Sequence, residues 1–331
     1  MTPLPARCRV GAGGLAVLLG AAATGLSPGA AESARATPAA PTFAVGARLE
    51  TFVDATRPTP ANGSFAGSPT RTLPTLVLYP AVGPAGPTDR TGAAPAGRAL
   101  PLIVFSHGSN SDGPTYEPLL RQWAEAGFVV AAPTFPLSRH GAPGGDTVAD
   151  YPHQPGDVSF VITSMLRLSR DPRARFRNVI DARRVGVVGH SLGAITTLGV
   201  AVNSCCADAR IRAAVSIEGI ELPFGSGTFF RGPAVPLLLF HGDADQTIPY
   251  SASQRLFADA PSPKYFVTLH GAPHTPFRQT DTATRPAPSW EPVVVTSVVD
   301  FLHRYLRGQP AGLTRLRVDA TVPGVASIQV G

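Results

Sequence analysis

Lysine, cysteine and long apolar runs are scarce in this chain of 331 residues. Lys264 is the single lysine, and the other basic residues are arginines scattered along the chain, although the formal net charge is +6. No basic run could follow a phosphate backbone, so the sequence predicts no nucleic-acid partner. The cysteines have no metal-ligand spacing, and we expect no metal site.

Two of the cysteines, Cys205 and Cys206, are neighbours in the chain. An oxidising compartment would permit a disulfide between them, but a ring closed by adjacent residues is strained. The sequence is equally compatible with two small buried cysteines, or with one cysteine that pairs with another molecule. The sequence alone leaves their state open.

The N-terminal segment has the pattern of a secretory signal peptide. Arg7 and Arg9 precede an apolar stretch over residues 10–26, and Ala34-Arg35-Ala36 supplies a small-residue cleavage site. The stretch is short and rich in Gly and Ala, which argues against a stable membrane span, although a retained anchor is the alternative. We expect residues 1–36 to be removed, residues 37–46 to form a flexible lead-in, and the mature protein to be secreted or extracytoplasmic.

The remainder, residues 47–331, alternates between apolar strand patterns and amphipathic helix patterns. Such alternation predicts one α/β domain with a mostly parallel sheet that helices cover on both faces. Ligands of such sheets bind at the carboxyl ends of the strands. The expected strands cover residues 48–54, 71–80, 100–106, 128–133, 185–188, 211–217, 235–240 and 264–269. The expected helices cover residues 116–127, 157–167, 194–200, 251–259 and 292–306, and residues 313–318 could form a helical turn or a short strand.

One stretch, residues 185–194, carries the strongest functional signal. A short apolar run ends in Gly189-His190-Ser191-Leu192-Gly193, and a helix-compatible segment follows. Strand, Gly-x-Ser-x-Gly and helix in this order are the pattern of a nucleophile elbow, a sharp turn that exposes a serine hydroxyl. The sequence therefore predicts Ser191 as a catalytic nucleophile.

A serine hydroxyl needs a base, and the base needs an orienting acid. For this elbow the chain order is serine, acid, histidine, and the loops after later strands offer Asp245 and then His274. We assign His274 as the base and favour Asp245 as the acid. Glu218, which ends the strand after the elbow, is the alternative acid, and Asp243 ranks below both.

The oxyanion formed during acyl transfer needs backbone donors. The elbow pattern assigns one donor to the N–H of Leu192, the residue after the nucleophile. The second should come from the loop after residues 100–106, where we choose the N–H of Ser109.

Four motifs together resemble the α/β-hydrolase superfamily: Phe105-Ser106-His107-Gly108, the elbow, His241-Gly242-Asp243-Ala244-Asp245 and Gly271-Ala272-Pro273-His274. The resemblance covers residues 45–307 and implies an α/β-hydrolase catalytic domain over residues 47–331. Within the superfamily, the chain is similar to an exported group that includes dienelactone-hydrolase-like, platelet-activating-factor acetylhydrolase-like and cutinase-like serine esterases.

This resemblance bears on both the acid and the nucleophile. The acetylhydrolase-like branch implies Glu218, whereas the polyester-hydrolase and dienelactone-hydrolase branches imply Asp245. A dienelactone hydrolase proper would be expected to use cysteine where this chain has Ser191, which argues against that narrow activity.

The segment between residues 220 and 235 is too short for a helical lid, so we expect an open cleft. Candidate apolar walls are Tyr116, Phe135, Phe224 and Trp290, although ordinary core packing would explain them equally well. The predicted activity is hydrolysis of small to medium acyl esters through an acyl-enzyme, by a monomer that needs no cofactor. Phospholipid or polyester hydrolysis, acyl transfer to another acceptor, and a non-catalytic binding protein of the same fold remain alternatives.

Overall fold

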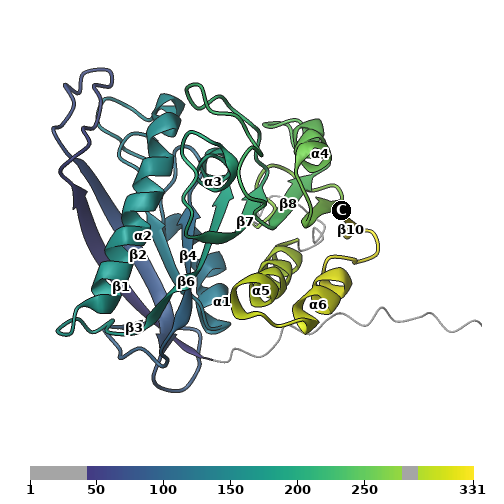
Figure 1. Cartoon of the computed structure of the whole chain (residues 1–331), viewed down its shortest axis with the longest axis horizontal. Helices are drawn as coiled ribbons and strands as arrows, with labels where there is room; N and C mark the ends of the chain where they lie inside the picture. Colours follow the sequence, from purple (N-terminus) through teal and green to yellow (C-terminus); the bar gives the residue numbers. More distant parts are fainter. Residues whose placement is uncertain (1–42, 278–289) are drawn as a thin grey trace, which may run out of the picture. The chain divides into compact units, whose positions relative to one another are not determined.

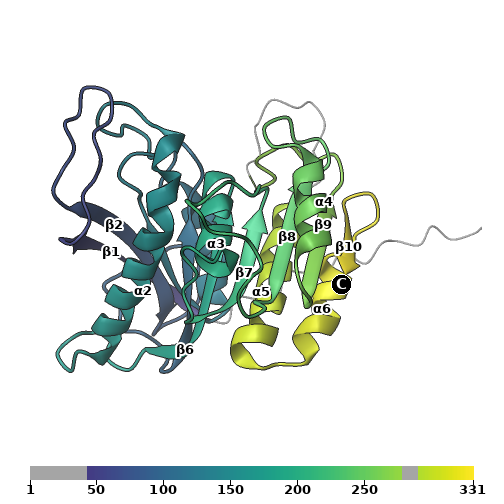
Figure 2. The same cartoon turned by 45° about the horizontal axis from the view of Figure 1, so that its top comes forward.

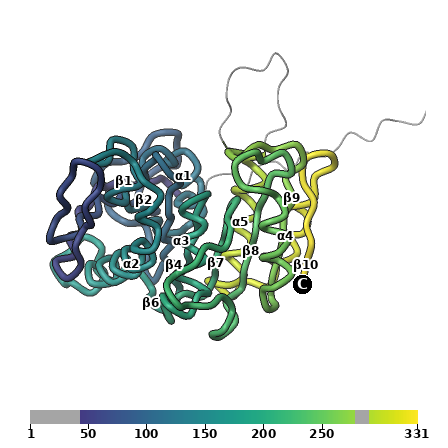
Figure 3. Tube along the Cα trace, turned by 90° about the horizontal axis from the view of Figure 1, so that it is seen from above, coloured from purple at the N-terminus to yellow at the C-terminus, as the bar shows by residue number. Residues whose placement is uncertain are grey.

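A ten-stranded sheet forms the centre of the computed structural model, which describes residues 43–277 and 290–331 (Figure 1). The strands follow the order β10-β9-β8-β7-β6-β4-β5-β2-β1-β3, and the tube in Figure 3 runs from β1 and β2 at one side to β10 at the other. The strands are β1 (Ala44–Asp54), β2 (Arg71–Ala81), β3 (Arg90–Thr91), β4 (Leu100–Ser106), β5 (Val129–Pro133), β6 (Ile180–His190), β7 (Ile211–Ile217), β8 (Leu237–Gly242), β9 (Lys264–Leu269) and β10 (Ala326–Val330). The proposed signal peptide and Cys8 lie outside the described residues.

The six strands from β9 across to β5 are parallel to one another. Antiparallel pairs occur towards the two edges, where β5 meets β2, β2 meets β1 and β9 meets β10. The prediction of a mostly parallel sheet is therefore confirmed. Because the parallel strands share one direction, their carboxyl ends lie along the same edge of the sheet.

Helices cover both faces of the sheet (Figures 1 and 2). One apolar core packs the sheet against α1, α5 and α6, and a second packs it against α2, α3 and α4. The helices are α1 (Glu117–Glu125), α2 (Gln154–Arg170), α3 (Leu192–Val202), α4 (Tyr250–Asp259), α5 (Glu291–Arg307) and α6 (Ala311–Asp319), with short 3₁₀ turns η1 (Pro114–Tyr116) and η2 (Val148–His153). No described helix combines the length and hydropathy that a membrane crossing requires.

The structure extends or adds to the predicted elements at β1, β6 and the C-terminal end. β1 begins at Ala44, inside the expected lead-in, and β6 begins at Ile180, where polar and partly exposed residues conceal the strand pattern. The tail that could be helix or strand is helical, and β10 follows it as an edge strand with mostly exposed side chains. Edge strands carry little hydrophobic alternation, which is why the sequence does not reveal β10.

Candidate active site

Ser191 occupies the sharp turn between β6 and α3. Its backbone has φ +56° and ψ −121°, a conformation that non-glycine residues adopt rarely and usually at functional sites. The flanking glycines are required by space: a Cβ on Gly189 would lie 2.1 Å from the Gly193 carbonyl oxygen, and one on Gly193 would lie 2.0 Å from the Ser106 carbonyl oxygen. The residues therefore form the turn that the Gly-x-Ser-x-Gly pattern indicates.

The loops after β9 and β8 bring His274 and Asp245 to this turn. The Ser191 hydroxyl lies 2.8 Å from Nε2 of His274, and Nδ1 of His274 lies 2.7 Å from Oδ2 of Asp245. The other Asp245 oxygen accepts the backbone N–H groups of Thr247 and Ile248, at 2.7 and 3.0 Å. Three residues far apart in the chain thus form one continuous line of hydrogen bonds.

The environment of Asp245 keeps its carboxyl group ionised. Burial alone would raise the pKa of Asp245, but hydrogen bonds from His274, Thr247 and Ile248 outweigh burial and lower it below its usual value. A negative charge is therefore present beside Nδ1 of His274 at neutral pH.

Glu218 is completely buried and lies at the same imidazole. Its Oε2 is 3.5 Å from Nδ1 of His274 and 3.2 Å from Nε2 of His190. Burial raises the pKa of Glu218 well above its usual value; the attraction of His274 opposes this shift and the charge of Asp245 adds to it. By distance and by charge, Asp245 is the stronger partner of His274.

The third candidate acid, Asp243, faces a different histidine. Its Oδ2 lies 3.1 Å from Nδ1 of His270, and its other oxygen accepts the N–H of Gly271 at 2.6 Å. These contacts close the turn after β9, and the Asp243 side chain is 37% exposed. The structure therefore does not bring Asp243 together with His274.

The loop after β4 passes directly beside Ser191. A Cβ built on Gly108 would lie 3.4 Å from Cβ of Ser191, so Ser109 follows at the edge of the elbow. Leu192 is the first residue of α3. Within the described part of the chain, neither the N–H of Ser109 nor that of Leu192 has a protein acceptor, as an oxyanion hole requires.

Hydrogen bonds of the His107 side chain hold this loop in place. Its Nε2 accepts the N–H of Phe135 at 3.0 Å, so Nδ1 carries the proton and donates to the Gly108 carbonyl at 2.7 Å. Burial lowers the pKa of His107 to about 4. The ring is therefore neutral at pH 7 and ties the loop after β4 to the loop after β5.

The side chains expected to form the walls of an open cleft are buried. Phe135 is 0% exposed, Phe224 is 2% exposed and Tyr116 is 6% exposed. Phe135 packs on the His107 ring, and Phe224 packs against α3 at Gly199. These three side chains are packed in the interior, and their role as substrate walls stays a prediction. Trp290 is partly buried and donates to the His270 carbonyl at 3.1 Å.

Other apolar side chains lie at the surface near the elbow. Tyr151, Ile220 and Leu222 are partly exposed and pack against a small cluster formed by Leu192, Ile195 and Phe224. We call these three side chains the apolar wall. The sequence does not reveal them because they come from η2 and from the irregular segment after β7, where no periodic pattern marks an exposed face.

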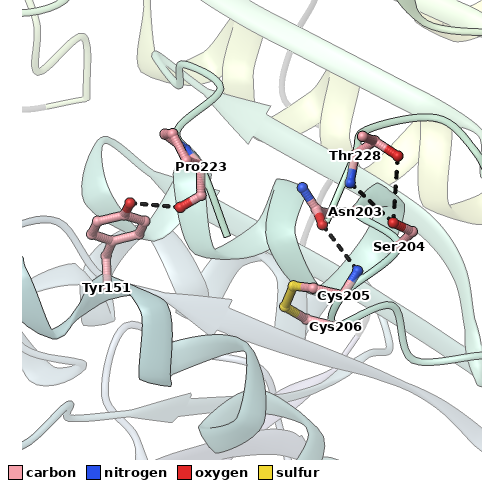
Figure 4. Close-up of a disulfide and its surroundings, with 7 residues drawn as sticks. All are labelled: Tyr151, Asn203, Ser204, Cys205, Cys206, Pro223 and Thr228. Atoms are coloured by element: carbon pink, nitrogen blue, oxygen red, sulfur yellow. Dashed lines mark hydrogen bonds between the residues drawn. A yellow bond between two sulfur atoms is a disulfide. The ribbon is translucent and has the colours of Figure 1, made fainter. Parts of the chain in front are cut away.

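The segment between β7 and β8 contains no helix, in agreement with the prediction that it is too short for a helical lid. Hydrogen bonds hold this segment to neighbouring parts of the chain (Figure 4). The Tyr151 hydroxyl donates to the Pro223 carbonyl at 2.6 Å, and the Thr228 N–H donates to Ser204 Oγ at 3.0 Å. Beside Ser204, Cys205 and Cys206 are joined by a disulfide, which answers the question that the sequence leaves open.

Within the described residues, His190, Glu218 and His274 are the only three potential metal ligands that lie close together. However, Nε2 of His190 donates to the His274 carbonyl at 2.8 Å, and Nδ1 of His274 donates to Asp245. Both nitrogens carry protons and have no lone pair for a metal, so this donor set does not fit a metal site.

Comparison with known proteins agrees with this architecture. The chain is similar to a ferulic acid esterase of known structure from Streptomyces cinnamoneus, with a TM-score of 0.59 and 24% identity over 84% of this chain and 94% of that one. It is also 24% identical over 205 residues to YfhR, an uncharacterized protein of Escherichia coli O157:H7; the match covers 56% of this chain and 66% of the relative's length. The alpha/beta hydrolase family model matches residues 103–326, which include the elbow and the loops that carry Asp245 and His274. The chain belongs to the alpha/beta hydrolase family.

Proposed function

We propose that this protein is a serine carboxylic-ester hydrolase in which Ser191 is the nucleophile, His274 the general base and Asp245 the orienting acid. The observation that carries the proposal is the continuous line of hydrogen bonds from Ser191 Oγ through His274 to Asp245. The strained elbow and the unoccupied N–H groups of Leu192 and Ser109 support it. A binding protein would need none of these features.

Each step follows from this arrangement. Ser191 Oγ bonds to the carbonyl carbon of the ester while its proton passes to Nε2 of His274, and Asp245 stabilises the resulting imidazolium. The N–H groups of Leu192 and Ser109 stabilise the oxyanion. The alkoxide leaves with the proton from His274, which yields the acyl-enzyme. Water then attacks the acyl group, gives its proton to His274 and releases the carboxylic acid, and Ser191 regains its proton.

The apolar wall supports small to medium acyl groups as substrates. The chain between Glu218 and Ile220 crosses the first turn of α3, because a Cβ on Gly219 would lie 2.8 Å from Cβ of Ala194. Ile220 therefore lies close to the elbow, where an acyl chain bound to Ser191 could bury several methylene groups. Each buried methylene contributes about 0.8 kcal/mol.

We expect Ile220→Ala to change the acyl preference. The smaller side chain removes apolar contact, so kcat/KM for p-nitrophenyl octanoate should fall about tenfold relative to p-nitrophenyl acetate. Val82→Ala, which shortens an exposed valine at the end of β2 next to Ala81, is the matched control. Parallel changes for both esters would show that Ile220 does not contact the acyl chain.

The proposed activity can be tested with a serine-directed fluorophosphonate probe and with p-nitrophenyl acetate. The parent protein should be labelled at Ser191 and should turn over the ester, and Ser191→Ala should lose both. Ser251→Ala, which removes an exposed hydroxyl on α4, should retain both. If the folded parent protein neither reacts with the probe nor hydrolyses the ester, the alternative of a non-catalytic binding protein is favoured. Labelling that persists in Ser191→Ala would show that the nucleophile is a different residue.

A further inference from the structure

His190, the residue before the nucleophile, contacts three loops at once. Its Nδ1 lies 2.8 Å from the hydroxyl of Tyr116, and its Nε2 lies 2.8 Å from the carbonyl oxygen of His274 and 3.2 Å from Oε2 of Glu218. Tyr116 lies in η1, which follows the loop after β4, Glu218 directly follows β7, and His274 lies in the loop after β9. One imidazole thus connects three of the strand ends around the elbow.

The direction of these hydrogen bonds follows from their partners. The His274 carbonyl can only accept, so Nε2 of His190 carries a proton. A neutral ring then accepts at Nδ1, which the Tyr116 hydroxyl can supply. The same hydroxyl accepts the N–H of Gly108 at 3.2 Å. The order from the loop after β4 is therefore Gly108 N–H, Tyr116 hydroxyl, His190 and the His274 carbonyl.

This chain of contacts is buried and closely packed. His190 is 3% exposed and Glu218 is 0% exposed. The Tyr116 ring packs on Phe105 with centroids 4.8 Å apart, and the His190 ring packs on Phe277 at the same distance. A Cβ on Gly108 would lie 3.1 Å from the Tyr116 hydroxyl and 3.3 Å from Nδ1 of His190. Little space remains for these groups to move independently.

We propose that Tyr116, His190 and Glu218 form a positioning relay that holds the oxyanion loop and the base loop in register with Ser191. Tyr116 fixes the N–H of Gly108, next to the proposed donor Ser109. His190 fixes the backbone of His274, and Glu218 anchors His190 from the end of β7. Glu218 then acts through His190 and does not serve as the acid of the triad. This inference rests on the proposed esterase function and adds residues that touch no substrate.

If the relay positions the oxyanion loop, a substitution in it should lower kcat without a matching change in KM. Tyr116→Phe removes the hydroxyl but keeps the ring between Phe105 and Phe277. A displacement of about 1 Å at the oxyanion loop can cost about 100-fold in rate. We expect kcat for p-nitrophenyl acetate to fall about 10- to 100-fold, with KM changed less than about twofold. Affinity for an alkyl boronic acid, which mimics the tetrahedral intermediate, should fall by a similar factor.

Two further variants make this test specific. His190→Phe keeps a ring but removes both nitrogens, so its loss of kcat should exceed that of Tyr116→Phe. Tyr265→Phe is the matched control, because it removes a buried tyrosine hydroxyl that pairs with Tyr305 instead, 2.8 Å away. Its kcat and boronic-acid affinity should match those of the parent protein.

The outcomes separate the relay from the function on which it rests. If Ser191→Ala is inactive while Tyr116→Phe keeps the parent kcat and boronic-acid affinity, the relay is wrong and the esterase stands. A loss confined to KM, or a fall in kcat without a loss of boronic-acid affinity, also overturns the relay. If the folded parent protein shows neither turnover nor probe labelling, the esterase proposal and the relay fall together.

Discussion

Ser191→Ala should lower kcat for a p-nitrophenyl ester about a million-fold, and Asp245→Asn should lower it about 10⁴-fold. Glu218→Gln should cost no more than about tenfold, because the amide oxygen can still accept from His190. The ranking follows from the proposed mechanism, in which Ser191 bonds to the substrate, and from two distances: Asp245 lies 2.7 Å from Nδ1 of His274, whereas Glu218 lies 3.5 Å from it.

Asparagine at position 245 has a specific defect. Its amide can donate towards His274, which favours the imidazole tautomer that carries its proton on Nε2 and cannot accept from Ser191. It also removes the negative charge that stabilises the imidazolium. Neither effect applies with the same strength to Glu218→Gln, because burial raises the pKa of Glu218 and its carboxyl oxygen lies 3.5 Å from Nδ1 of His274.

The measurement is kcat and KM for p-nitrophenyl acetate, with circular dichroism to show that each variant is folded. If Glu218→Gln is the inactive variant and Asp245→Asn retains activity, the acid of the triad is Glu218. Equal losses in both variants, together with a double variant no worse than either single one, would mean that the two carboxyl groups act as one unit.

The sequence locates the centre of the site because local chain geometry creates it. A serine between two glycines, after an apolar strand and before a helix, needs no distant residue to define its turn. Asp245 and His274 are recognisable because loops at the carboxyl ends of parallel strands converge on that turn. The sequence favours Asp245 but leaves Glu218 as an alternative, since both follow such strands and only atomic distances distinguish them.

The surroundings of the site depend on packing between distant segments, which a sequence pattern does not encode. Tyr116 is an aromatic residue of the kind that lines substrate pockets, but its hydroxyl forms a hydrogen bond with His190, which is 74 positions later in the chain. Phe135 and Phe224 are large enough to fill the interior and do so. The partly exposed wall instead comes from Tyr151, Ile220 and Leu222, whose positions are set by irregular segments.

Arg71→Met should destabilise the fold by about 3–5 kcal/mol, because it removes one partner from a buried ionic network. Arg71 is 0% exposed, and its guanidinium group contacts both oxygens of Asp150 and both oxygens of Asp157 at 2.6–3.1 Å. Asp157 retains a contact with Arg57, which is partly exposed, whereas Asp150 lies in η2 beside Tyr151 of the apolar wall. The network thus joins the start of β2 to the segment that carries part of the wall.

Unfolding in guanidinium chloride at several pH values would test this prediction, with Arg183→Met as the control for loss of an exposed arginine. Burial raises the pKa of Asp157 in the parent, and the hydrogen bonds and charge of Arg71 oppose that rise, so without Arg71 the folded-state pKa of Asp157 should rise further above its unfolded value. The folded variant then binds more protons than the unfolded chain, so it gains stability relative to the parent as the pH falls. The difference between variant and parent should be larger at pH 8 than at pH 5. A constant small difference would mean that the aspartates find other partners, and Arg71→Met would then leave η2 and the apolar wall in place.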